Sequence, residues 1–161
     1  MKIKYLIIVL TALCALNLAT RVSAAETAAS ANPRSHSPEG TTVTFGTPHD
    51  GDVVPTTFTV KFLISGMGIA PAGSKSDDTG HHHLLIDVTK LPPMDQPLPM
   101  SDQLRHSGKG QTSVELTLAE GEHSLQLLFA DYAHVPHDPV ILSEKIHITV
   151  SADAVAETAE K

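Results

Sequence analysis

The sequence has few residues that could crosslink the chain or hold a metal through sulfur. Its 161 residues include one cysteine, Cys14, no tryptophan and 4% aromatic residues. One cysteine cannot form an intrachain disulfide, and the missing Cys/Trp/Cys pattern excludes an antibody-type immunoglobulin domain. If Cys14 is removed during export, thiolate zinc sites and blue-copper sites are excluded as well. Any bound metal must then use nitrogen, oxygen or thioether ligands.

Several catalytic motifs are also missing. The sequence has no Gly-x-Ser-x-Gly nucleophile elbow, no His-Glu-x-x-His helix and no glycine loop that follows a strand to cradle a phosphate. It has no long segment of helical periodicity and no internal repeat. We therefore expect a protein that is not an enzyme. The catalytic alternative is a metal-dependent hydrolase with Asp131 nearby, which would need three ligands and an open coordination position.

The first 24 residues are typical of a secretory signal peptide. Lys2 and Lys4 form a basic start, an apolar run follows over 5–18, and 22–24 is a small-residue cleavage site. The apolar run is shorter than the ~20 residues of a membrane span. We expect cleavage before Ala25 and a periplasmic or secreted protein with no stable membrane insertion.

Acidic residues outnumber basic ones. The chain has 11 Lys and Arg, 18 Asp and Glu and a net charge of −7 with neutral histidines; loss of residues 1–24 would change this to about −10. This balance argues against nucleic acid and anionic membrane surfaces as partners. It suits a protein that attracts cations.

Short strand patterns fill the middle of the chain. We expect a flexible leader over 25–40, a single β-sandwich domain over 41–150 and a flexible tail over 151–161. Within the domain, β-branched and apolar residues predict strands at 42–45, 57–65, 81–88, 113–118, 123–130 and 141–150. The pattern predicts an all-β fold, namely an antiparallel immunoglobulin-like β-sandwich of about seven strands.

Histidine is the most informative residue type present, and three of the ten histidines are consecutive. His81, His82 and His83 open the strand predicted over 81–88. Alternation along the strand places His82 with the inward apolar residues, where it would serve as a structural histidine bonded to a backbone carbonyl. His81 and His83 then point outward together, about 7 Å apart along the strand. Two rings at this spacing can reach one ion.

Three further histidines are predicted to reach this outward pair. In an immunoglobulin-like sandwich, the loop before this strand and the loop between the last two strands lie at the same end. His134 and His137 lie in the second of these loops, and His106 lies in a long loop over 89–111 that can fold back over this end. We therefore predict one metal site built from His81, His83, His106, His134 and His137. The remaining histidines, at 36, 49, 123 and 147, are predicted to be structural or surface residues.

The ligand types restrict the metal. Imidazole without thiolate favours Cu(II), Zn(II) or Ni(II), and we expect copper or zinc. The methionines at 67, 94 and 100 lie in predicted loops, where a thioether would favour Cu(I), although methionine is more often a filler. The acidic turns at 50–52 and 77–78 do not have EF-hand spacing. Proton-linked behaviour or recognition of an anion by the histidines stays open as an alternative.

Several short motifs span the predicted domain. They are Gly-His-His-His-Leu-Leu-Ile-Asp at 80–87, Leu-Pro-Pro at 91–93, Asp-Gln-Pro at 95–97, His-Ser-Gly-Lys-Gly-Gln-Thr at 106–112, Gly-Glu-His-Ser-Leu-Gln-Leu at 121–127, His-Val-Pro-His-Asp-Pro at 134–139 and Ser-Glu at 143–144. Together they resemble a bacterial family of exported single-domain proteins classed as a domain of unknown function, over roughly residues 41–150. The resemblance implies a periplasmic β-rich domain and implies no activity.

These observations predict a periplasmic histidine-rich protein that binds or handles copper or zinc. Its expected partners are the metal ion or a periplasmic protein. The alternative is a non-catalytic interaction module whose histidines are structural. Such a module would bind a protein or a cell-envelope ligand through the proline-rich loop over 89–111.

Overall fold

The structure, a computed structural model, describes residues 34–155, and all the regular secondary structure in this range is β. The strands are β1 (Thr42–Thr47), β2 (Val53–Val54), β3 (Thr57–Ser65), β4 (Gly68–Ile69), β5 (Thr79–Ile86), β6 (Leu104–His106), β7 (Ser113–Thr117), β8 (Gly121–Ala130), β9 (Pro136–Leu142) and β10 (Ile146–Val150). Within the described range no helix is long and apolar enough to cross a bilayer. The predicted signal peptide lies outside the described residues.

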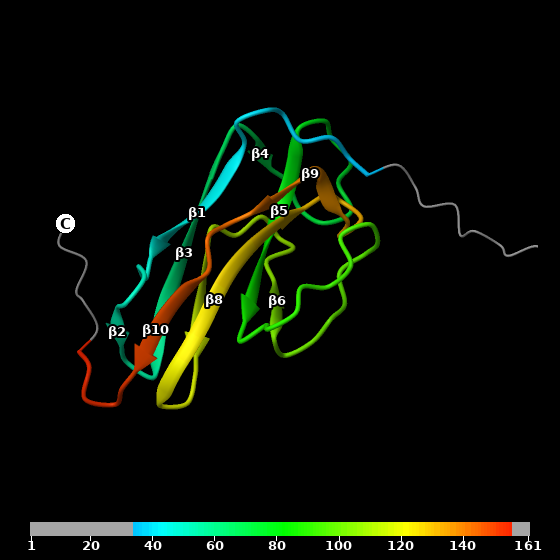
Figure 1. Cartoon of the computed structure of the whole chain (residues 1–161). Coiled ribbons are helices and arrows are strands. Elements are labelled where there is room, and N and C mark those ends of the chain that lie inside the picture. The colour runs from blue at the N-terminus through cyan, green and yellow to red at the C-terminus, as the bar shows by residue number, and fades with distance from the viewer. Residues whose placement is uncertain (1–33, 156–161) are drawn as a thin grey trace, which may run out of the picture.

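The strands form two facing sheets (Figure 1). One sheet has the order β1-β3-β7, and the other has the order β2-β10-β8-β5-β4, with β6 paired to β5 and β9 paired to β8. The predicted all-β sandwich is confirmed. The strands predicted at 81–88, 123–130 and 141–150 share one sheet, as the immunoglobulin-like topology requires.

The strand count differs from the predicted seven because short strands and one interruption were not foreseen. The structure describes ten strands, of which β2, β4 and β6 have only two or three residues each. The strand predicted at 141–150 is divided between β9 and β10. At this break the Oγ atom of Ser143 accepts a hydrogen bond of 2.9 Å from the amide of Leu127 on β8, so a side chain replaces a backbone carbonyl there.

The main hydrophobic core lies between the two sheets. It contains alternate residues of β3, such as Phe62, and alternate residues of β5 and β8, such as Leu84, Ile86 and Phe129. This spacing of two is the strand period, because successive side chains point to opposite faces. The inward face predicted for these strands is therefore correct.

A second, smaller core lies on the outer face of the larger sheet. Leu85 of β5 and Leu128 of β8 pack there against Leu98 and Leu104, which belong to the long segment over 87–111. This segment, which includes β6, covers the outer face of β5 (Figure 1). Side chains on that face are consequently buried, although a two-layer sandwich would leave them in solvent.

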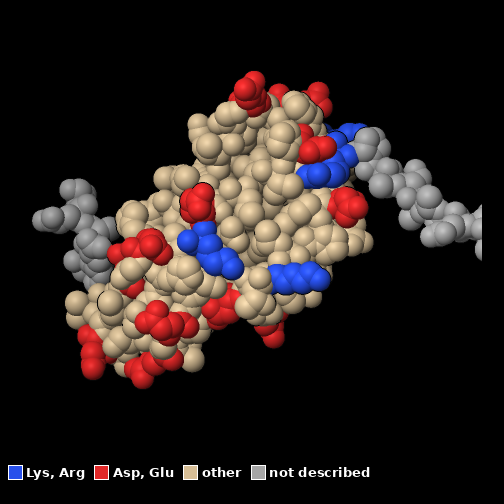
Figure 2. All heavy atoms as spheres, viewed as in Figure 1, with Lys and Arg blue, Asp and Glu red and all other residues tan. Residues whose placement is uncertain are grey.

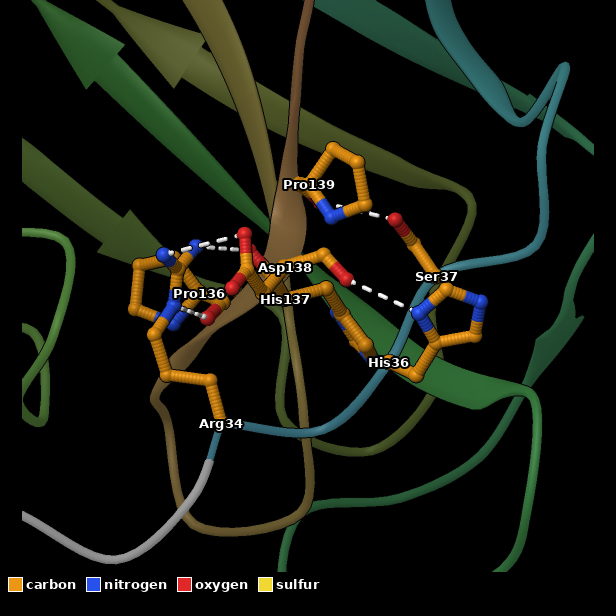
Figure 3. A network of polar contacts seen from close by, with 7 residues as sticks. All are labelled: Arg34, His36, Ser37, Pro136, His137, Asp138 and Pro139. Carbon is orange, nitrogen blue, oxygen red and sulfur yellow. Dashed lines mark hydrogen bonds and ion pairs between the residues drawn. The ribbon is translucent and has the colours of Figure 1, made fainter.

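Residues 34–40, which we expected to belong to a flexible leader, lie along the domain instead. Ser37 and Asp138 are joined by a backbone hydrogen bond of 3.1 Å, and the amide of Asp138 donates to the carbonyl of Ser35 at 2.9 Å. The segment thus adds to the edge of β9, as Figure 3 shows. Positions 25–33 of the predicted leader lie outside the described residues.

Candidate metal centre

Four of the five predicted ligands come together in one compact group. His81 and His83 of β5, His106 of β6 and His134 of the turn over 131–135 each offer a ring nitrogen, and these nitrogens all lie within 4.8 Å of one another. A tetrahedral site with metal–nitrogen distances of about 2.0 Å needs nitrogens about 3.3 Å apart. Small ring movements would therefore bring the four nitrogens to coordination distance. We call these residues the four-histidine cluster.

Strand pairing positions three of the four rings. His81 and His83 share the outer face of β5, and their ring centroids are 4.7 Å apart. His106 is the direct cross-strand partner of His83 in the antiparallel pairing of β5 with β6. Their rings stack, with a centroid distance of 5.1 Å and an interplanar angle of 29°. Opposite residues in such a pair are close neighbours, so the register itself brings His106 to the cluster.

A tight turn brings the fourth ring. Oδ1 of Asp131 accepts hydrogen bonds from the amides of Ala133 at 2.9 Å and Val135 at 3.0 Å. Between them His134 has a φ of 65°, a left-handed conformation that is uncommon for residues other than glycine. An aspartate side chain that bonds nearby amides stabilises turns of this kind. Nδ1 of His134 then lies 3.1 Å from Nε2 of His81, within hydrogen-bond distance.

The cluster runs from the protein interior to the surface. His81 and His83 are buried, His134 is half-buried and His106 is exposed. A pocket of about 130 Å³ lies against His83, His106 and His134, and its other walls are Leu98, Pro99, Met100 and Leu104. Met100 is 92% exposed. An ion could therefore reach the buried rings through this pocket, past His106.

Burial keeps the inner histidines of the cluster neutral. Burial, together with the neighbouring rings of His81, His106 and His134, lowers the pKa of His83 to about 2. Burial, with His106 and His134, lowers the pKa of His81 to about 4, against an opposing effect of Asp131. Burial and His134 also lower the pKa of His106. Neutral imidazole is the form that binds metal ions.

Two ring nitrogens of the cluster are buried without partners. Within the described part of the chain, Nδ1 of His81 and Nδ1 of His83 have no hydrogen-bond partner. Leaving a buried polar group unsatisfied costs about 1–3 kcal/mol. Four imidazoles packed together at such a cost are unusual in a purely structural core, so the cluster is the best candidate for a functional site.

His137, the fifth predicted ligand, lies outside the four-histidine cluster. Its ring is buried and stacks on Phe129, with centroids 5.9 Å apart. Phe129 belongs to the core between the sheets, whereas the cluster lies on the outer face of β5. The chain reverses at His134, and Pro136 pairs with Ala130, so the two histidines are directed to opposite faces. Burial lowers the pKa of His137, and the backbones of Phe129 and Thr79 and the Asp131 carboxylate oppose this effect.

His82 faces the inner core, as predicted. Its ring lies 5.1 Å from that of Phe62 and 5.0 Å from that of Phe129. The predicted hydrogen bond to a backbone carbonyl is not made, since neither ring nitrogen has a partner among the residues described. Burial lowers the pKa of His82 to about 4, and the backbone of Gln111 has a smaller opposite effect.

The histidines predicted to be structural or surface residues lie away from the cluster. His123 donates from Nδ1 to Asp87 at 2.7 Å and from Nε2 to the carbonyl of Ala119 at 3.0 Å, which ties the start of β8 to the end of β5. The side chains of His49 and His147 are 74% and 67% exposed. These placements agree with the sequence prediction for His49, His123 and His147.

The sequence did not reveal the positioning role of two residues, although it offered Asp131 as a nearby carboxylate for the catalytic alternative. Asp131 holds the turn that carries His134, and the sequence signal is an aspartate two residues before an amide that it can bind. Gly108 lies against His106 so closely that any added Cβ atom would overlap the ring. No local sequence signal distinguishes Gly108 from an ordinary turn glycine.

Comparison with known proteins assigns the chain to a family without adding a function. No curated protein and no solved structure matches it. The model of a family described as a domain of unknown function (DUF4399) matches residues 60–151, a range that contains all four histidines of the cluster. The match spans more than half of the sequence, and the chain belongs to this family.

Proposed function

We propose that this chain is a periplasmic or secreted protein that binds or handles copper or zinc through the four-histidine cluster. The observation that carries the proposal is the convergence of four imidazoles, from three separate segments, with ring nitrogens within 4.8 Å of one another. The low pKa values of His81 and His83 support it, because both rings are neutral at pH 7 and each then has one ring nitrogen available to bind a metal ion. The predicted signal peptide supports export.

The charge of the protein also suits a cation as ligand. The net charge is −7, and Figure 2 shows acidic side chains at both ends of the visible face with few basic ones between them. A negative surface raises the local concentration of cations and disfavours nucleic acid. We therefore propose a metal ion as the primary partner.

The ligand set favours binding over catalysis. Four imidazoles complete a tetrahedral coordination shell, whereas a catalytic zinc keeps one position open for water or substrate. Nitrogen ligands suit copper and zinc alike. Met100 lines the pocket, and its thioether would favour Cu(I) over Zn(II) if it joined the site. Measurement of Cu(I), Cu(II) and Zn(II) affinities separates these ions.

Metal titration of the untagged protein tests the proposal. We expect one equivalent of Cu(II) or Zn(II) to bind, and we expect His106→Ala to lower the affinity at least tenfold. His106 is the ligand to replace because its exposed ring can be removed without opening a cavity in the core. His147→Ala, which removes another exposed imidazole, is the matched control and should leave the metal affinity unchanged. Absence of stoichiometric binding, or equal affinities of the two variants, would refute the proposed site.

One observation favours a second function, an interaction module without metal. A direct hydrogen bond of 3.1 Å between the ring nitrogens of His81 and His134 joins β5 to the turn over 131–135. In this case the cluster would shape the end of the sandwich, and the segment over 87–111 would bind a periplasmic protein. The same titration then shows no metal binding, while replacement of His134 lowers the free energy of unfolding.

A further inference from the structure

We propose that residues 34–37, which we call the N-terminal strap, regulate the metal affinity of the four-histidine cluster by holding the turn that carries His134. Ser35 and Asp131 are the positioning residues through which the strap acts. This inference rests on the proposed metal-binding function and goes beyond it. With the strap in place the turn is rigid and the affinity is high; when the strap is released, the affinity falls.

The strap is attached to β9 by backbone and side-chain contacts. Figure 3 shows His36 and Ser37 beside Asp138 and Pro139, with Arg34 at the other end of the strap. Nε of Arg34 donates to the carbonyl of Pro136 at 2.9 Å, and its guanidinium lies 3.5 Å from the carboxylate of Asp138. These contacts join positions about a hundred residues apart in sequence. The attachment is therefore part of the tertiary structure and is separate from the sheet pairing of β9 with β8.

Ser35 connects the strap to the turn. Its Oγ donates a hydrogen bond of 2.6 Å to Oδ2 of Asp131. The other carboxylate oxygen, Oδ1, accepts the amides of Ala133 and Val135, which flank His134. Asp131 is 5% exposed, so water is largely excluded from competing for these bonds. One carboxylate thus serves the turn with one oxygen and the strap with the other.

This division gives Ser35 control over the orientation of the carboxylate. The plane of an aspartate carboxylate rotates easily, because the torsion that sets it has a broad energy minimum. A hydrogen bond to the charged oxygen is of the strong, short kind and fixes that rotation. Without the bond, Oδ1 holds the two amides less firmly, and the left-handed conformation of His134 is less well defined. Asp131 is not one of the four clustered residues, so it acts by positioning His134.

Replacement of groups that orient metal ligands typically costs 10–100-fold in affinity. We expect Ser35→Ala to weaken Cu(II) or Zn(II) binding by about tenfold, at the lower end of that range, because Asp131 itself remains. Ser35→Thr keeps the hydroxyl and should retain most of the affinity. The Cu(II) electron paramagnetic resonance spectrum of Ser35→Ala should also show a mixture of coordination geometries.

Ser37→Ala is the matched control, because it removes an equivalent hydroxyl from the same strap. Oγ of Ser37 donates to the carbonyl of Pro139 at 2.7 Å, whereas the hydroxyl that bonds Asp131 is that of Ser35. Its side chain is more buried than that of Ser35, so Ser37→Ala should lower the free energy of unfolding at least as much. We expect its metal affinity to stay within twofold of the original.

Two measurements test the role of the strap. They are metal affinity by chelator competition and hydrogen exchange of the metal-free protein. The inference is supported if Ser35→Ala alone loses metal affinity about tenfold and its Ala133 and Val135 amides exchange faster. Equal affinities of the Ser35→Ala and Ser37→Ala variants, whether both normal or both weakened, overturn the role of the strap and leave the metal site standing. If the original protein binds no metal, the proposed function fails and this inference fails with it.

Discussion

Gly108 is packed against the ring of His106, and a Cβ atom at position 108 would overlap that ring. The φ of Gly108 is not in the left-handed region, so alanine is compatible with the backbone and acts on the ring alone. We expect Gly108→Ala to displace His106 and to lower metal affinity about tenfold, the size of effect typical of groups that orient a ligand. Isothermal titration measures the loss.

A double variant provides the control for this prediction. In a His106→Ala background, Gly108→Ala should have no further effect on affinity, because the ring that it displaces is gone. Non-additive effects of this kind identify residues that act on each other. Additive losses in the double variant would show that Gly108 acts through some other part of the structure.

The depressed pKa values of the cluster predict that the metal-free protein loses stability in acid. The unfolded chain titrates its histidines near 6.5, while the pKa of His81 is about 4 and that of His83 about 2 in the folded state. Below pH 6.5 the unfolded state therefore binds protons that the folded state does not, and stability falls as pH drops toward 4. Each such histidine contributes a slope of up to about 1.4 kcal/mol per pH unit.

Urea unfolding at pH 7, 5.5 and 4.5 measures this dependence. In the His83→Leu variant the free energy of unfolding should fall less between pH 7 and 4.5, because one proton-binding group is removed from the unfolded state. The variant also removes one unsatisfied ring nitrogen from the folded state. A free energy of unfolding that stays constant from pH 7 to 4.5 would contradict the low pKa values of these two buried rings.

The pair formed by His123 and Asp87 predicts the opposite pH dependence. Burial acts to lower the pKa of His123, but the hydrogen bond to Asp87, the carbonyl of Ala119 and the nearby carboxylates raise it above its usual value. The stabilisation from this pair is complete below pH 6.5 and is lost as pH rises through the raised pKa. We expect His123→Gln to cost most stability near pH 6 and less near pH 9, with a difference below about 1 kcal/mol.

Thermal unfolding of the original protein and the His123→Gln variant at several pH values tests this expectation. His147→Gln serves as the control, because its exposed ring is 3.7 Å from Asp50 and solvent weakens such a contact. A destabilisation by His123→Gln that does not change between pH 6 and 9 would show that the ring acts through packing alone.

The separate positions of His134 and His137 predict different effects of the same substitution. His134→Leu removes a ligand, so we expect metal affinity to fall at least 100-fold. His137→Leu replaces a buried ring whose Nδ1 has no partner in the described structure, so stability should change little and metal affinity should stay within twofold. Competition titration of the two variants is the measurement. A large loss of affinity in His137→Leu would place this residue in the site after all.

Much of the fold could be predicted from local patterns. Alternation of apolar residues identified the inward faces of β3, β5 and β8, and the order of the strands along the chain indicated which of them share a sheet. Both signals are local or topological, so they can be recognised in the sequence without knowledge of side-chain contacts. The same reasoning placed His82 in the inner core and His81 with His83 on the other face.

The burial of that other face could not be predicted in this way. His81 and His83 are buried because the segment over 87–111 folds across them, and Leu98 and Leu104 complete a second core there. Loop packing of this kind depends on contacts between residues far apart in sequence, which periodicity does not encode. The same limitation applies to the strap, whose composition is typical of a loop and whose attachment depends on β9.

By itself the sequence determined the chemistry that is available: many imidazoles, no cysteine after position 14, and a strand that presents two histidines on one face. Only the tertiary structure decided which rings meet. The register of β5 with β6 brought in His106, and the turn stabilised by Asp131 directed His134 to the cluster and left His137 on the opposite face. The physical reason is that ring position depends on backbone torsions and long-range pairing, since a reversal at one residue changes the face that the next side chains occupy.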